Sequence, residues 1–316
     1  MTAVATGTAT DFWAFYNALR DFLTTNADLV SASEQWTQIA GNTGTLTDSD
    51  YEYIVEGPGA SGTDTIRVYV TASVSAVDGR YNIGLRGVTT YNSALDPSAQ
   101  ANMSGTVWVP LWNAGTIPYT FVGSGRRFIF HAQVSTVFEA GYAGFFLPFA
   151  IPSEYPYPLC VGGSTATETD LYSTSDVDHC HFVNPGNGSL KVLFPDNIWR
   201  DFTNFTQGAG NSQTWQVSRT TAPWQSPWDA TISLYHRGSM ATLREGFGGG
   251  YPLIPVTLQC VSPGDAVLGV LDGCYWTPGI GNTAGNVVTV DSVDHLVIQN
   301  VSRTDNFQGY WALALE

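Results

Sequence analysis

The sequence predicts an all-β protein with one N-terminal α-helix, folded into β-sandwich-like domains. Apolar residues recur at period 2 in several stretches beyond residue 41, as they do in half-buried strands. One stretch near the N-terminus instead has helical spacing. The 316 residues include 33 Gly and 16 Pro but only 12% charged residues, which is typical of strands joined by long turns.

The helix is predicted in TDFWAFYNALRDFLTT, residues 10–25, where Thr10 or Asp11 can cap the start. Its broad apolar stripe includes Phe12, Phe15, Tyr16 and Leu19. We favour packing of this stripe on the chain's own β-domain over packing on a partner. Under the second interpretation these side chains are contact candidates. Removal of residues 1–25 is then expected to prevent assembly while the β-domains stay folded.

Three strands follow the helix. The stretch DTIRVYVTA alternates apolar and polar residues, and YEYIVEG precedes it through the Gly-rich loop GPGASG, residues 57–62. The two are therefore expected to form a hairpin. RYNIGLRGVTTY is the third predicted strand.

The most apolar part of the chain begins at Phe128. Its even positions are mostly apolar as far as Phe146, which predicts one very long strand or two strands in register across a bulge. Prolines at 148, 152, 156 and 158 end the sheet because they lack a donor and fix φ. Tyr155 and Tyr157 in the extended segment that follows are contact candidates, on their own domain or on a neighbouring subunit.

The domain organisation is predicted from changes in composition. Residues 1–40 form the helix and a linker, 41–199 form a β-rich domain, and 200–316 form a second β-rich domain or half that can pack with the first. Residues 161–187 are expected to form a long surface loop. Asp272-Gly273 lies between two apolar runs, which predicts a two-residue hairpin.

The charge balance argues against several classes of partner. The formal net charge is −15 and Lys191 is the single lysine, so direct nucleic-acid binding and a polybasic membrane patch are not expected. The apolar run around 137–151 contains Glu139 and Pro148 and is too short for a spanning helix, so membrane insertion is not expected. The N-terminus also lacks the pattern of a signal peptide.

The four cysteines do not define a disulfide framework or a C-x-x-C site. Cys160, Cys180, Cys260 and Cys274 are expected to be buried thiols by default. A bridge between Cys260 and Cys274 across neighbouring strands is the alternative that stays open.

The sequence contains one candidate metal-binding site, a pair of histidines. His179 and His181 would point to the same side of a strand, and a His-x-His pair can hold zinc or iron, but no third ligand lies nearby in the sequence. We favour a hydrogen-bonded cluster. No nucleophile motif or phosphate-binding loop is found, so we expect no enzymatic activity and no cofactor.

Two further features are assigned to interfaces. The Gly-rich loop at residues 246–252 contains the contact candidates Phe247 and Tyr251. Aromatic clusters such as WVPLW could stack on sugars, but a core or a subunit interface is the interpretation we favour.

Several stretches together resemble a family of tailed-bacteriophage virion structural proteins. They are the N-terminal helix, EGPGASGTDTIRV, the long stretch from VPLWN to CVGGS, and the ending from LDGCYWTPGIGN to GYWALALE, which together span nearly the whole chain. The resemblance implies a virion component that is assembled in the bacterial host cytoplasm, with copies of itself and other phage structural proteins as partners. It carries no catalytic signature, so no functional residues are transferred.

The expected function is therefore that of a non-enzymatic structural subunit in the tail or neck, such as a collar, a baseplate or a fibre attachment. The first alternative is a receptor- or glycan-binding module on the virion, with a host-surface glycan as ligand. The second alternative is a β-fold glycoside hydrolase, which would need a pair of carboxylates in a cleft.

Overall fold

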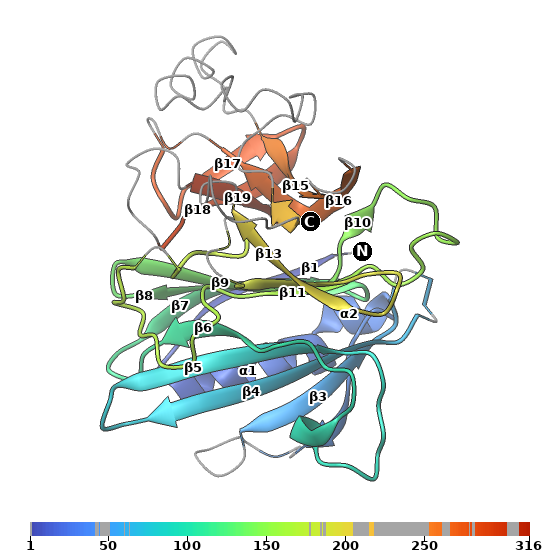
Figure 1. Cartoon of the computed structure of the whole chain (residues 1–316). Helices are drawn as coiled ribbons and strands as arrows, with labels where there is room; N and C mark the ends of the chain where they lie inside the picture. The colour runs from blue at the N-terminus through green and yellow to red at the C-terminus, as the bar shows by residue number, and fades with distance from the viewer. Residues whose placement is uncertain are drawn as a thin grey trace.

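The fold is described from a computed structural model of the whole chain (Figure 1). The description covers all residues except 1, 42–43, 45–50, 60, 63, 177, 184, 186–187, 205–214, 218–252, 261–265, 278, 280–281 and 302–309. Within these limits the protein is mostly β with a helix near the N-terminus, which confirms the predicted fold class.

The smaller sheet has five antiparallel strands. In spatial order they are β2 (Thr37–Gly41), β3 (Glu52–Gly57), β4 (Ile66–Ser75), β5 (Arg80–Val88) and β6 (Val107–Leu111). The pairing of β3 with β4 confirms the predicted hairpin, and β5 is the predicted third strand.

The larger sheet has 14 strands within the described residues. Its first half, in spatial order, is β1 (Ala3–Ala9), β7 (Ile117–Ser124), β8 (Arg127–Val134), β9 (Val137–Phe145), β11 (Leu159–Gly162), β12 (Leu190–Leu193) and β13 (Trp199–Asn204). It continues through β14 (Trp215–Val217), β15 (Ile254–Cys260), β16 (Ala266–Trp276), β19 (Tyr310–Ala314), β18 (Val293–Gln299) and β17 (Val287–Val290). The short β10 (Leu147–Pro148) pairs with β16 outside this path.

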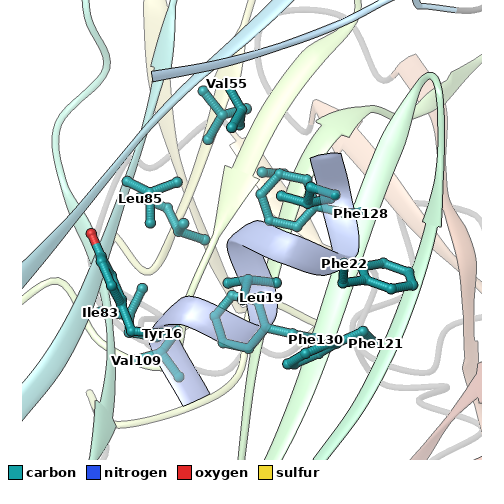
Figure 2. Packing of buried hydrophobic residues seen from close by; sticks show 14 of the residues in the cluster. Tyr16, Leu19, Phe22, Val55, Ile83, Leu85, Val109, Phe121, Phe128 and Phe130 are labelled. Carbon is teal, nitrogen blue, oxygen red and sulfur yellow. The ribbon is translucent and has the colours of Figure 1, made fainter. Parts of the chain in front are cut away.

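The helix α1 (Phe12–Thr25) lies between the two sheets (Figures 1 and 2). The Asp11 carboxylate caps it by accepting a hydrogen bond from the Ala14 amide at 2.8 Å. Figure 2 shows the helix with side chains of the smaller sheet, such as Leu85, on one side and side chains of the larger sheet, such as Phe121 and Phe128, on the other. We call this cluster the inner core.

The helix packs on the chain's own sheets, which confirms the interpretation we favoured. The alternative, in which its apolar stripe contacts a partner, is wrong. Phe12, Phe15, Tyr16 and Leu19 are fully buried within the chain, so they offer no surface to a partner. Removal of residues 1–25 would also remove β1 and the side chains that fill the space between the sheets. This burial argues against the expectation that the β-domains stay folded after the truncation. A second, short helix, α2 (Ala27–Ser31), follows α1 directly.

The long strand predicted after Phe128 is a hairpin instead. β8 and β9 pair from Val134 and Val137 outwards, with Ser135 and Thr136 as the turn. Directly paired residues share a face, so the even positions of β8 lie on the same face as the odd positions of β9. The even positions stay apolar across the turn, but they face the inner core in β8 and the opposite side of the sheet in β9. The sequence pattern does not show this change of face.

The hairpin predicted at Asp272-Gly273 is a continuous strand. Both residues lie inside β16, where Gly273 has φ +75° and the register with β15 shifts nearby. The glycine therefore allows a local irregularity within the strand and does not form a turn. A Cβ at Gly273 would lie 2.8 Å from the Arg127 guanidinium, so the position also gives that side chain room.

The opposite face of the β7–β9 region packs against the C-terminal strands. Ile129 and Tyr142 join Leu271, Trp276 and Trp311 in a second cluster, which we call the outer core.

The domain boundary predicted between residues 199 and 200 falls inside β13. The loop predicted at residues 161–187 begins inside β11, and its residues 161–165 and 179–183 are buried, so the expectation of a surface loop is wrong for these parts.

Candidate interaction surface

The predicted histidine pair lies in the buried part of that loop. His179 Nδ1 lies 3.0 Å from the Thr174 carbonyl oxygen, and its Nε2 lies 3.1 Å from Glu139 Oε1. His181 Nε2 lies 2.7 Å from the Phe138 carbonyl oxygen, and its Nδ1 lies 3.0 Å from the Trp311 indole nitrogen. All four ring nitrogens therefore contact protein groups, so this pair is a hydrogen-bonded cluster and the metal interpretation is wrong. No group of three or more His, Cys, Asp or Glu is arranged to hold a metal among the described residues.

The two histidines differ in charge. Burial alone lowers the pKa of His179, but the Glu139 carboxylate and the Thr174 carbonyl outweigh it and raise the pKa to about 9. Burial lowers the pKa of His181 to about 3, and it lowers that of His131 to about 4. Both ring nitrogens of His131 lack a hydrogen-bond partner among the residues that the structure describes, and its ring stacks on Phe138 with centroids 5.4 Å apart.

The contact candidates Tyr155 and Tyr157 pack on their own chain. The Tyr155 hydroxyl donates to the Leu193 carbonyl oxygen at 2.6 Å, and its ring contacts Phe146. The Tyr157 hydroxyl donates to the Thr65 carbonyl oxygen at 2.8 Å. These rings therefore anchor the segment and do not form a contact surface. The candidates Phe247 and Tyr251 lie outside the described residues.

The proline-rich segment, residues 148–158, exposes other side chains instead. Phe149 is 62% exposed and Ile151 is 59% exposed, although both are large and apolar. β10 holds the start of the segment to β16, and the Phe149 amide donates to the Leu268 carbonyl oxygen at 2.9 Å. Ile198, in the turn between β12 and β13, is 54% exposed. Tyr155 links this turn region to the segment through its bond to Leu193.

A cleft of about 390 Å³ lies beside the same segment. Pro156 and Tyr157 line one part of it, and Phe194 and Pro195 of the β12–β13 turn region line another. Arg67 also lines the cleft, but Glu56 neutralises its charge across a distance of 2.7 Å.

A second hollow, which we call the sheet groove, lies on the solvent face of the smaller sheet. Its volume is about 370 Å³, and its lining includes Tyr51, Tyr69, Arg80, Arg86, Trp108 and Glu168. The hydroxyl groups of Thr71, Ser73 and Thr106 lie in the same lining. Because strands alternate, Arg80, Asn82, Gly84 and Arg86 all lie on one face of β5.

The cysteines agree with the default expectation where they are described. Cys160, Cys180 and Cys274 are buried, and none of the three forms a disulfide within the described residues. The register pairs Cys260 with Ala266, whereas Cys274 pairs with Leu313 of β19. The backbone register therefore does not place the two cysteines opposite one another in neighbouring strands.

Comparisons with known proteins give no relative. No protein-family model matches the chain, and no curated protein has a detectably similar sequence. Among the described residues, no helix has the length and apolar character needed to cross a membrane.

Sequence reasoning missed the two groove arginines. They are single charges in a sequence without basic clusters, so a search for charge runs passes over them. The signal that could have found them is the alternation in RYNIGLRG, which places Arg80 and Arg86 on the face opposite Ile83 and Leu85.

Proposed function

We propose that the chain is a non-enzymatic structural subunit of a tailed-phage virion, associated with the tail or neck, that acts through self-assembly. The observation that carries the proposal is the exposed apolar surface on the proline-rich segment. Large apolar side chains that project from a well-anchored segment are typical of surfaces that become buried on association. The sequence resemblance and the low content of charged residues support the same proposal.

The segment is suited to a defined contact because its backbone is held in place. Prolines restrict φ, and two tyrosine hydroxyls tie the segment to the Leu193 and Thr65 carbonyl oxygens. A pre-ordered segment loses little conformational entropy when a neighbouring subunit binds it. We assign this surface to a second copy of the chain in the assembled particle.

The test compares the wild-type chain with a Phe149→Asp, Ile151→Asp double variant. We expect self-association of the wild type by light scattering over a concentration series, and monomers for the variant. We also expect the tagged wild-type chain, but not the variant, in particles purified from infected cells. Val77→Asp is the matched control, because Val77 is 97% exposed in the β4–β5 turn and its variant should assemble normally. A wild-type chain that is monomeric and absent from particles would refute the proposal.

A second candidate function is a glycan-binding module on the same virion. The sheet groove favours it, because aromatic rings, hydroxyl groups and arginines converge there. Glu168 is the one described carboxylate in the groove lining, so the described part of this groove does not provide the pair that glycoside hydrolysis requires.

A further inference from the structure

The sheet groove differs from the rest of the described surface in that its arginines form no ion pairs. Six of the described Lys and Arg side chains form ion pairs: Arg20, Arg67, Arg126, Arg127, Lys191 and Arg200. Arg80 and Arg86 form none with any described carboxylate, and both line the groove. In a chain with a net charge of −15, acidic partners are abundant. Two such arginines in one hollow therefore indicate a site for an anionic ligand.

The environment of each guanidinium leaves bonding capacity for a ligand. Arg86 Nε donates to the Ser104 carbonyl oxygen at 2.7 Å, which orients the guanidinium. Burial lowers the pKa of Arg86, which shows that water only partly solvates its charge. Arg80 Nε is buried and has no hydrogen-bond partner among the described residues. The protein therefore does not use up the bonding capacity of this guanidinium.

The rest of the groove is fixed by contacts across the chain. Asn82 is fully buried, and its amide nitrogen donates to the carbonyl oxygens of Glu168 and Asp170 at 2.7 and 2.8 Å. Ser73 donates to Glu168 Oε1 at 2.7 Å. These bonds hold the loop that forms one wall of the groove against the sheet. The site is therefore present before any ligand binds.

The groove floor depends on a glycine. A Cβ on Gly84 would lie 2.7 Å from the Trp108 ring and 2.8 Å from the Thr71 methyl group. The missing side chain lets these two groups meet over the centre of β5. Trp108 is buried at 8% exposure, whereas Tyr51 is 42% exposed, so the exposed aromatic surface in the groove lining is mainly that of Tyr51.

These features specify the chemistry of the ligand. Guanidinium groups bind carboxylate or sulfate through paired charged hydrogen bonds. Hydroxyl side chains and Glu168 exchange hydrogen bonds with sugar hydroxyls, and aromatic rings offer flat apolar area. We infer that the sheet groove binds an anionic saccharide, with Arg80 and Arg86 holding its acidic group. This inference deepens the second candidate function and is independent of the role of the proline-rich segment.

The test uses the purified full-length chain and two matched pairs of probes in titration calorimetry. Oligogalacturonate is compared with its methyl ester, and dextran sulfate is compared with dextran, so that each pair separates the carboxylate or sulfate from the sugar. Inorganic sulfate distinguishes a saccharide site from a simple anion site. The net charge of −15 disfavours non-specific binding of polyanions, so binding reports a local site.

We expect at least one acidic saccharide to bind, and its neutral counterpart and inorganic sulfate to bind at least about ten-fold more weakly. Arg80→Gln and Arg86→Gln should each weaken binding by about ten-fold or more. Arg200→Gln is the matched control, because Arg200 pairs with Asp196 at 2.6 Å outside the groove, and it should bind as the wild type does. Unchanged thermal unfolding of the arginine variants separates lost binding from lost folding.

Three results with the saccharides would overturn the inference: no binding of either acidic saccharide, equal binding of the acidic and neutral members of a pair, or equal weakening by Arg200→Gln. If inorganic sulfate binds as tightly as the saccharides, the groove is a simple anion site, and this result would also overturn the inference. None of these results depends on particle assembly. Failure of the groove and failure of the structural role are therefore distinguishable.

Discussion

The two faces of β8 lie in different surroundings although they belong to one strand. The side chains on the even positions, Phe128, Phe130, Ala132 and Val134, all enter the inner core with the helix and the smaller sheet. On the odd positions, Arg127 and His131 accompany Ile129 against the C-terminal strands. The inner face is held by apolar packing, whereas the outer face also buries groups that can carry charge. The inner face can be predicted from the local pattern of apolar residues. The outer face cannot, because its charged residues pair with residues far along the chain.

The largest expected effect tests the apolar face. Phe130→Ala should lower the free energy of unfolding by about 3–5 kcal/mol, because the buried ring leaves a cavity beside Phe15, whose ring centroid lies 5.8 Å away. Chemical denaturation measures the change. Phe149→Ala is the matched control, since its ring is 62% exposed and its loss should change stability by no more than about 0.5 kcal/mol. Equal effects at the two positions would contradict the assignment of the inner core.

The second prediction tests the charged contact on the outer face. Asp272 Oδ2 lies 2.8 Å from Arg127 Nε and 2.7 Å from Arg126 Nη2. Asp272→Asn would leave the buried Arg127 charge without a counter-ion, so we expect a loss of about 3 kcal/mol by chemical denaturation. Asp196→Asn, which breaks the exposed pair with Arg200, should cost no more than about 1 kcal/mol. If Asp272→Asn costs as little, the outer face does not depend on charge pairing.

The third prediction uses pH to test the neutral histidine on the same face. Burial lowers the pKa of His131 from 6.5 to about 4, so between these values the unfolded chain binds more protons than the native chain. Stability should therefore fall as the pH decreases from about 6.5 to about 4. His131→Phe keeps an aromatic ring against Phe138 and sacrifices no hydrogen bond of the ring. The variant should be more stable than the wild type by about 2 kcal/mol at about pH 5.

The neighbouring titrating groups define the control for that experiment. His181 also has a lowered pKa, so part of the acid-induced loss should remain in the variant. The raised pKa of His179 acts at the other end of the range, because its stabilising proton is lost as the pH rises from about 6.5 to about 9. Substitution of His131 should leave that alkaline part unchanged. Identical pH profiles of the variant and the wild type would contradict a neutral, buried His131.

The same comparison shows how far the sequence could predict the fold and the site. The helix and several strands, including β4 and β5, follow from local periodicity. The ion pair on the outer face could not be predicted, because Arg127 and Asp272 are 145 positions apart and no local pattern links them. Turn signals also misled: Ser135-Thr136 lacks the usual hairpin residues but forms the β8–β9 turn, whereas Asp272-Gly273 has them and lies within β16.

The smallest expected effect concerns the turn that exchanges the two faces. Ser135 has φ +57°, a conformation that costs an L-residue about 1 kcal/mol or more and costs glycine little. Ser135→Gly should therefore stabilise the chain by up to about 1 kcal/mol, because relief of strain exceeds the added entropy of the unfolded chain. Thr136→Gly is the control, since its φ is not positive and its loss should destabilise by about 0.5–1 kcal/mol. Destabilisation by both variants in chemical denaturation would show that the Ser135 side chain, and not its backbone conformation, holds the turn that sets which positions of β9 face the inner core.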